Sequence, residues 1–356
     1  MGRFALLLHP SANRVYARAS VGLTVAELAV ADRALGGGRL QDVAPTMIAG
    51  VPYVGFGADA VDGRTVTVLG LLSAGYALFE VDRDQLRPVP LVRQDRLDDD
   101  LVTIPKYAGK TNEHFTRLLL AVTLLSSDVA ADLGARRFAV LDPLCGRGTT
   151  LNQALVYGWN AAGIERDRRD VDAYAAFVQT WLKRKRLPHR ADYAPVRRNR
   201  QVVARRLHVT LAPTREAFRA GDTTELTVLN ADTTAAGDFF RAASFDLVVA
   251  DAPYGVQHGS RGDRGLSRGP LDLLSAAVPR WAALLRPGGA VGISWNTTVA
   301  RREDAARVLA DAGLDVLDGG PYAAFRHRVD QAVIRDVLVA RKVRRSPSAP
   351  GVDQGE

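Results

Sequence analysis

From Phe138 onward, short apolar runs alternate with segments of helical periodicity, a pattern typical of parallel strands joined by crossover helices. The expected strands cover residues 138–142, 160–165, 226–232, 245–251 and 290–296. The expected helices cover residues 150–157, 171–185, 271–285 and 301–312, and the third is expected to end at the RPGG that follows it. The runs LDVLDG and AVIRDVLVARK predict a terminal antiparallel pair. Together they predict an α/β fold, Rossmann-like and doubly wound, with a seven-stranded, mostly parallel sheet.

Residues 1–105 follow a different pattern. The runs FALLLH, VPYVGFGA and TVTVLGLLSAGYALFEV have the character of strands and surround one amphipathic helix, VGLTVAELAVADRALGG. We therefore predict a smaller N-terminal α+β domain, for which a ferredoxin-like arrangement is one possibility. The stretch LRPVPLVRQDRLDDDLVTIP has the prolines and charges of a linker. The predicted plan is this domain and linker over residues 1–105, a second domain over 106–343, and a disordered tail over 344–356.

The amino-acid composition indicates the class of protein and the compartment in which we expect it. The 356 residues are 47% hydrophobic and 24% charged, which is typical of a soluble globular protein. A single cysteine, Cys145, excludes an internal disulfide framework and a multi-cysteine metal site. The apolar run in MGRFALLLHP is too short for a signal peptide, and no run approaches the roughly 18 apolar residues of a membrane span. We expect a cytoplasmic protein without membrane or metal.

The net charge of +8 is concentrated in one place. Residues 183–206, KRKRLPHRADYAPVRRNRQVVARR, hold ten Lys or Arg and one Asp, and we call them the basic segment. Such a cluster favours a polyanion such as RNA or DNA, because neutralised phosphates release counterions. The alternative is an arginine surplus that reflects only a GC-rich genome. The expected nucleic-acid contacts within this segment are Lys183, Arg184, Lys185, Arg186, Arg197, Arg198 and Arg200.

The stretch VLDPLCGRGTT leaves the first strand of the second domain and enters a helix. Gly146 and Gly148 allow the backbone to pass close to a ligand at the start of that helix. Leu151 stands where a dinucleotide fingerprint needs its third glycine, which counts against NAD. Asp142 would repel a pyrophosphate but can hold an ammonium group. S-adenosylmethionine carries an ammonium and a sulfonium and no phosphate.

The next two strands also end in acids. Glu165 follows Gly146 at the spacing at which an acid reaches ribose hydroxyls in such folds. Asp232 lies at the same predicted edge, where its carboxylate can accept the amino group of adenine. Any one of these acids is as easily a cap of the following helix. Three of them beside a glycine-rich loop predict a bound S-adenosylmethionine.

The stretch ADAPYG ends the fourth strand of the second domain, next to the first. Asp251 is thereby expected beside the methyl group of the cofactor. Hydrogen bonds from an exocyclic base amine to Asp251 and to a carbonyl of the turn would aim the amine's lone pair at that methyl group. Tyr254 would stack on the base. The alternative is a rigid turn without chemistry.

In this order, DPLCGRGTT, GIERD, LNAD and DAPYG resemble the class I S-adenosylmethionine-dependent methyltransferases that modify exocyclic amines. Within them the sequence most resembles the tRNA guanine-N2-methyltransferases, which often carry a THUMP domain and a D-P-P-Y motif. KYAGKTNEHFTRLLL and HRVDQAVIRDVLVARK are similar to the segments that open and close that catalytic domain, so the resemblance covers residues 105–343. Ala252 replaces the first proline of the motif, and residues 1–105 show no THUMP signature.

The resemblance implies roles for individual residues. The methionine part of S-adenosylmethionine would contact Asp142, Gly146 and Gly148, its ribose Glu165 and its adenine Asp232. The amine site would consist of Asp251, Pro253 and Tyr254, and Thr111, Asn112 and Phe115 would approach the cofactor's carboxylate. The expected reaction is methylation of guanosine N2 in tRNA. A DNA adenine-N6 or cytosine-N4 methyltransferase and a non-catalytic RNA-binding module are the alternatives.

Overall fold

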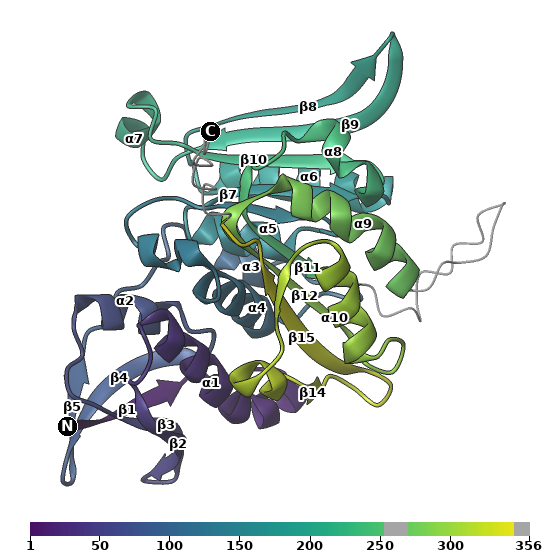
Figure 1. Ribbon diagram of the computed structural model, residues 1–356. Helices are drawn as coiled ribbons and strands as arrows, with labels where there is room; N and C mark the ends of the chain where they lie inside the picture. Colours follow the sequence, from purple (N-terminus) through teal and green to yellow (C-terminus); the bar gives the residue numbers. More distant parts are fainter. Residues whose placement is uncertain (253–269, 345–356) are drawn as a thin grey trace, which may run out of the picture.

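The computed structural model describes residues 1–252 and 270–344, which form two β-sheets with helices packed against them (Figure 1). The smaller sheet is antiparallel, with the strand order β2-β3-β1-β4-β5. Its βαββαβ chain order is that of a ferredoxin-like fold, to which β5 adds an edge strand. The elements are β1 (Gly2–Leu8), α1 (Arg14–Ala34), β2 (Gln41–Ile48), β3 (Val51–Ala58), α2 (Gly63–Leu71), β4 (Gly75–Asp82) and β5 (Gln85–Val89).

Helix α2 corrects the prediction for TVTVLGLL, which was expected to be a strand. The carboxylate of Asp62 caps the helix, because it accepts the backbone N–H of Thr65 at 2.7 Å and the hydroxyl of Thr65 at 2.8 Å. Val68, Leu69 and Leu71 are buried in the core. The cap and this burial outweigh the modest helix penalty of the β-branched residues.

The larger sheet confirms the predicted α/β fold class, but it has ten strands where seven were predicted, because β8, β9 and β14 add to it. Its strand order is β13-β15-β12-β11-β6-β7-β10-β9-β8, with β14 paired to β15. Strands β12, β11, β6, β7 and β10 pair in parallel, and β15 pairs antiparallel with β12 and β13. The strands are β6 (Ala139–Asp142), β7 (Asn160–Glu165), β8 (His189–Arg198), β9 (Gln201–Leu211), β10 (Thr224–Asn230), β11 (Phe245–Asp251), β12 (Leu285–Asn296), β13 (Asp315–Leu317), β14 (His327–Arg328) and β15 (Ile334–Arg341).

Crossover helices cover the larger sheet, as the alternating pattern predicts (Figure 1). None of the helices in the described residues is long and apolar enough to cross a membrane. The helices of this part are α3 (Asp100–Thr103), α4 (Glu113–Leu125), η1 (Asp128–Asp132), α5 (Thr149–Val156), α6 (Arg168–Arg184), α7 (Arg215–Arg219), η2 (Thr233–Ala235), α8 (Ala236–Phe239), α9 (Pro270–Leu284), α10 (Arg302–Asp311) and η3 (Gly320–Ala324).

Two local features differ from expectation. The RPGG stretch does not cap α9 but lies within β12, where the pairing with β11 skips from Leu285 to Ala290. The basic segment contributes to an antiparallel hairpin, β8–β9, that extends the sheet beyond β10. Asn199 and Arg200 form its two-residue turn, and their φ angles of 48° and 66° are those of a type I′ turn.

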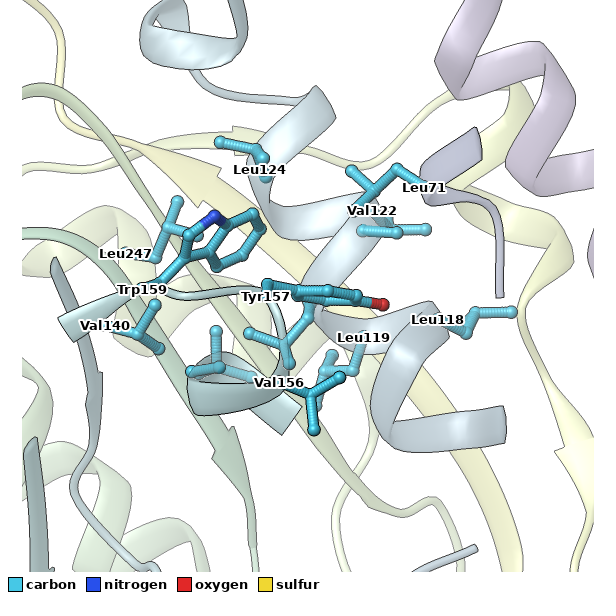
Figure 2. Close-up of a cluster of buried hydrophobic side chains, with 14 of the residues drawn as sticks. Leu71, Leu118, Leu119, Val122, Leu124, Val140, Val156, Tyr157, Trp159 and Leu247 are labelled. Carbon is cyan, nitrogen blue, oxygen red and sulfur yellow. The ribbon is translucent and has the colours of Figure 1, made fainter. Parts of the chain in front are cut away.

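A continuous hydrophobic cluster joins the smaller sheet to the larger one. Figure 2 shows part of it, where Leu71 of α2 and Val122 of α4 lie near Tyr157 and Trp159. The rings of Tyr157 and Trp159 are 4.9 Å apart. Helix α4 also packs against β12 and α1, so one helix fixes the larger sheet relative to the N-terminal residues.

Candidate active site

Four sequence-predicted acids lie at the carboxyl ends of neighbouring strands. β6 lies between β7 and β11, so Asp142 at its end is flanked by Glu165 of β7 and Asp251 of β11. Asp232 follows β10, the next strand beyond β7. In an open α/β sheet this edge is where ligands bind.

Asp142 is buried, with 3% of its surface exposed. One carboxylate oxygen accepts the backbone N–H of Leu144 at 3.1 Å. Burial raises the pKa of Asp142 to about 7, and the negative charges of Asp251 and Glu165 add to the increase. A cation placed between these carboxylates would offset both their mutual repulsion and the energetic cost of their desolvation.

The glycine-rich loop between β6 and α5 is shaped by its two glycines. Gly146 has a φ of +50° and no atom within 4 Å of the place a Cβ would occupy, so the backbone there is open to a ligand. Gly148 has a φ of +79°, and a Cβ would lie 2.5 Å from the ring of Tyr174. Gly148 is therefore required by both conformation and packing, whereas Gly146 leaves space.

Glu165 ties this loop to β7. Its carboxylate accepts the backbone N–H of Gly146 at 3.0 Å and that of Asp167 at 2.6 Å. Burial raises the pKa of Glu165. Asp232 is exposed and caps η2, because it accepts the backbone N–H of Thr234 at 2.9 Å and the hydroxyl of Thr234 at 2.6 Å. Asp232 therefore has the helix-capping role that was the alternative to a contact with adenine.

Asp251 is held from three elements. The hydroxyl of Thr111 donates to one of its oxygens at 2.7 Å, and the hydroxyl of Ser294 on β12 donates to the other. The guanidinium of Arg335 on β15 lies 3.5 Å from the carboxylate. These contacts fix the orientation of the Asp251 carboxylate at the edge of the sheet.

Thr111, Asn112 and Phe115, the three residues expected near the cofactor's carboxylate, lie at the start of α4 in different surroundings. Thr111 contacts Asp251 directly. Asn112 caps α4, because its side chain accepts the backbone N–H of Phe115 at 3.1 Å. Phe115 is fully buried, and the guanidinium of Arg335 lies 4.0 Å from the centre of its ring. Phe115 thus supports Arg335 from within the core.

Pro253 and Tyr254 lie outside the described residues. Ala252, which precedes them, is 2% exposed, and its backbone N–H donates to the carbonyl of Ser294 at 2.8 Å. The chain is therefore anchored to β12 up to residue 252. Within residues 1–252 and 270–344, no cluster of three or more His, Cys, Asp or Glu is placed to hold a metal ion.

Ser294 and Arg335 are the site residues that sequence reasoning missed. Ser294 faces Asp251 in the β11–β12 register, which no local motif shows. The sequence offered a weak indication of Arg335, because an arginine close to the apolar run VLVA is unusual in a buried strand.

The basic segment divides between opposite edges of the sheet. Lys183, Arg184, Lys185 and Arg186 lie at the end of α6, near the starts of β8 and β10, and Lys185 pairs with Asp98 at 2.7 Å. Arg197, Arg198 and Arg200 lie at the β8–β9 turn. Because Arg205 of β9 pairs with Asn230, the last residue of β10, that turn projects about 16 Å past the carboxyl edge.

Three solved structures similar to this chain are methyltransferases. A TehB-like SAM-dependent methyltransferase from Corynebacterium glutamicum is 15% identical over 60% of this chain and 84% of that chain, with a TM-score of 0.33. A T. thermophilus 16S rRNA N2 methyltransferase in complex with AdoMet and guanosine is 15% identical over 60% of this chain and 38% of that chain, with a TM-score of 0.30. A 1,6-didemethyltoxoflavin-N1-methyltransferase from Burkholderia thailandensis is 17% identical over 67% of this chain and 94% of that chain, with a TM-score of 0.33.

The sequence matches no family model and no curated protein. The TM-scores of the three similar structures are all low.

Substitution of the two loop glycines should destabilise the protein to different extents. Gly148→Ala should lower the free energy of unfolding by about 3 kcal/mol, because the new Cβ meets Tyr174 and the left-handed φ is strained. Gly146→Ala should cost only about 1 kcal/mol, the strain of its φ alone. Denaturant unfolding of both variants checks the difference, and equal losses would contradict the close approach of Tyr174.

Proposed function

We propose that this chain is an S-adenosylmethionine-dependent RNA methyltransferase that methylates the exocyclic N2 of guanosine in tRNA. The observation that carries the proposal is the buried Asp142 beside the open glycine loop, one strand away from Asp251. This arrangement places an acceptor for a cationic ligand next to an acceptor for an amine.

The residues present fit the cofactor. The backbone at Gly146 leaves room for a ligand, and Asp142 offers a carboxylate that an ammonium group would match. The carboxylate of Glu165 can accept about four hydrogen bonds, and two backbone N–H groups donate to it. A ribose hydroxyl can therefore still donate to this carboxylate. When bound, the cofactor supplies an electrophilic methyl group on a sulfonium.

The contribution of the protein is to orient the amine. An exocyclic amine of guanine is a weak nucleophile, because its lone pair is delocalised into the ring. A hydrogen bond from that amine to Asp251 and another to the carbonyl of Ala252 would draw the nitrogen toward tetrahedral geometry. Thr111, Ser294 and Arg335 keep Asp251 in one orientation for this task. Tyr254, outside the described residues, is expected to stack on the base.

The hairpin turn supports RNA as the substrate. Arg197 and Arg200 are exposed and project past the same sheet edge at which Asp142 and Asp251 lie. A nucleic acid that places a base at Asp251 is thereby within reach of a positively charged arm. The segment Lys183–Arg186, at the opposite edge, contributes less to the proposed contact.

The deciding experiment incubates the protein with labelled S-adenosylmethionine and total tRNA, rRNA or DNA, and then identifies the methylated nucleoside. N2-methylguanosine in tRNA is the expected product. Transfer only to DNA would replace the RNA assignment with that of an adenine-N6 or cytosine-N4 methyltransferase. Binding of tRNA without any transfer would show a non-catalytic RNA-binding module.

Asp251→Asn should lower the rate of methyl transfer by about 10³-fold and leave cofactor affinity unchanged, because the amide is isosteric but is a weaker, uncharged acceptor for the amine. Single-turnover kinetics and calorimetric titration with S-adenosylmethionine measure the two quantities. The matched control is Asp246→Asn, an acid on the same strand that pairs with Arg136 and Arg286 away from the site. Loss of cofactor binding in Asp251→Asn would place Asp251 in the cofactor site instead.

Cofactor affinity should rise with pH between 5 and 7. The ammonium group binds the ionised form of Asp142, whose pKa in the free protein is about 7, so below that pH binding must expel a proton. The affinity should then fall by up to about tenfold per pH unit below 7. In this range the amino group of the cofactor stays protonated.

Calorimetry at pH 6 in two buffers of different ionisation enthalpy measures the expelled proton. Asp142→Asn should bind the cofactor weakly and release none. Wild-type binding that is independent of pH, or equal proton release by the variant, would remove Asp142 from the site.

Charge reversal at the hairpin turn should weaken tRNA binding. Arg197→Glu with Arg200→Glu should raise Kd at least tenfold and make the slope of log K against log salt less negative by about 1.5, as two lost phosphate contacts require. Lys183→Glu with Arg184→Glu, at the opposite edge, is the matched control and should change Kd less than threefold. Fluorescence anisotropy over a series of salt concentrations measures Kd and its salt dependence. A larger increase in Kd for the control pair would contradict the placement of the RNA at the hairpin turn.

A further inference from the structure

A cavity lies between the N-terminal residues and the larger sheet. It has a volume of about 470 Å³, and its walls come from α1 on one side and from the end of η3 and β14 on the other. The residues that matter for its chemistry are Arg18, Gly22, Leu23, Arg326, His327 and Arg328. None of the acids of the candidate active site lines it.

The rim of this cavity is positively charged. Arg18, Arg326 and Arg328 are all exposed, and none of them has a carboxylate within 4 Å among residues 1–252 and 270–344. Elsewhere, Arg302 and Arg335 are engaged with acids. Three guanidinium groups without acidic partners suit a phosphate, which they can bind through forked hydrogen bonds.

The inner wall is apolar. Val15, Ala19 and Leu23 of α1 contribute aliphatic surface, and Gly22 has no atom within 4 Å of the place a Cβ would occupy. His327, a residue with 7% of its surface exposed, forms the floor. Its Nδ1 donates to the carbonyl of Phe325 at 2.9 Å, and burial lowers its pKa, so the ring is a neutral aromatic surface. Such a wall and floor suit a nucleobase.

The cavity is preformed, because aromatic contacts hold its two sides together. The ring of Tyr16 on α1 meets the ring of His327 edge to face at 5.9 Å. Arg33, also on α1, lies 5.5 Å from the ring centre of Tyr322 in η3. The two sides of the cavity are therefore held in place before a ligand binds, which lowers the ordering cost of binding.

The cavity adjoins the candidate active site. His327 of β14 pairs with Arg335 of β15, one strand spacing away, and the guanidinium of Arg335 reaches Asp251. Phe115 lies against both, 5.4 Å from the ring of His327 and 4.0 Å from the guanidinium of Arg335. A polymer whose target base lies at Asp251 can thus place a nearby nucleotide in the cavity.

We propose that this cavity binds one nucleotide of the RNA substrate near the methylated base, with the phosphate on Arg18, Arg326 and Arg328 and the base against α1 and His327. The assignment rests on the proposed function, and it adds a site that positions the RNA at the junction of the two sheets. The volume of about 470 Å³ lies in the range of sites for small organic ligands.

The test fills the cavity without disturbing the fold. Gly22→Leu places a side chain in open space, and in a helix interior leucine is also a better helix former than glycine. Its matched control is Gly22→Ala, which fills little. Arg326→Glu with Arg328→Glu removes two of the three phosphate contacts, and Arg280→Glu with Arg307→Glu, two exposed arginines that do not line the cavity, controls for the equal change in net charge.

The measurements are Kd for a short labelled oligoribonucleotide, KM and kcat for a tRNA that the wild type methylates, and affinity for S-adenosylmethionine. Gly22→Leu and the double arginine variant should raise Kd and KM at least tenfold, with kcat within about twofold and cofactor affinity unchanged. Both controls should match the wild type. If Gly22→Leu binds RNA as Gly22→Ala does while the wild type methylates tRNA, the cavity assignment is wrong and the proposed function stands.

A parallel titration with guanosine 5′-monophosphate separates the two sources of a nucleotide. Weak binding of this mononucleotide, lost in Gly22→Leu together with oligoribonucleotide binding, supports the assignment. Binding of the mononucleotide by a wild type that neither binds nor methylates RNA would mark a free-nucleotide site, and would overturn both the RNA assignment and the proposed function.

Discussion

The guanidinium of Arg335 is the contact on which the rest of this architecture depends. It is almost completely buried, and it lies between the carboxylate of Asp251 and the ring of Phe115. A buried charge that loses its partner costs about 3–5 kcal/mol, so Asp251 and Arg335 each restrict the other to its place. Through this pair, β11, β15 and α4 are held in one arrangement, and α1 joins them through Tyr16 and His327.

The electrostatics of the site follow from the same arrangement. Arg335 offsets one carboxylate, whereas Asp142 and Glu165 receive mainly backbone N–H groups and remain close to one another. Burial is the main cause of the raised pKa values of Asp142 and Glu165, and the negative charges of neighbouring acids add to it. A cationic ligand bound at this edge would favour the ionised forms of both carboxylates.

The sequence predicted the parts of the fold in which local pattern and tertiary structure agree. The strands at residues 160–165 and 245–251 have the predicted bounds, because their apolar runs are buried on both faces. The stretch TVTVLGLL was wrongly predicted to be a strand. It is a helix because Asp62 caps it and one of its faces is buried. The partners of Asp251 lie 43 and 84 positions away in Ser294 and Arg335, a separation that no periodicity encodes.

The hairpin β8–β9 has a consequence beyond any contact with RNA. β8 is the last strand of the larger sheet, so its outer side offers unpaired backbone groups to another strand. Pro195 has no N–H to donate there, and the arginines along β8 repel the same strand of a second copy. The charges that we propose attract a polyanion would therefore also disfavour pairing of β8 with the same strand of a neighbouring molecule.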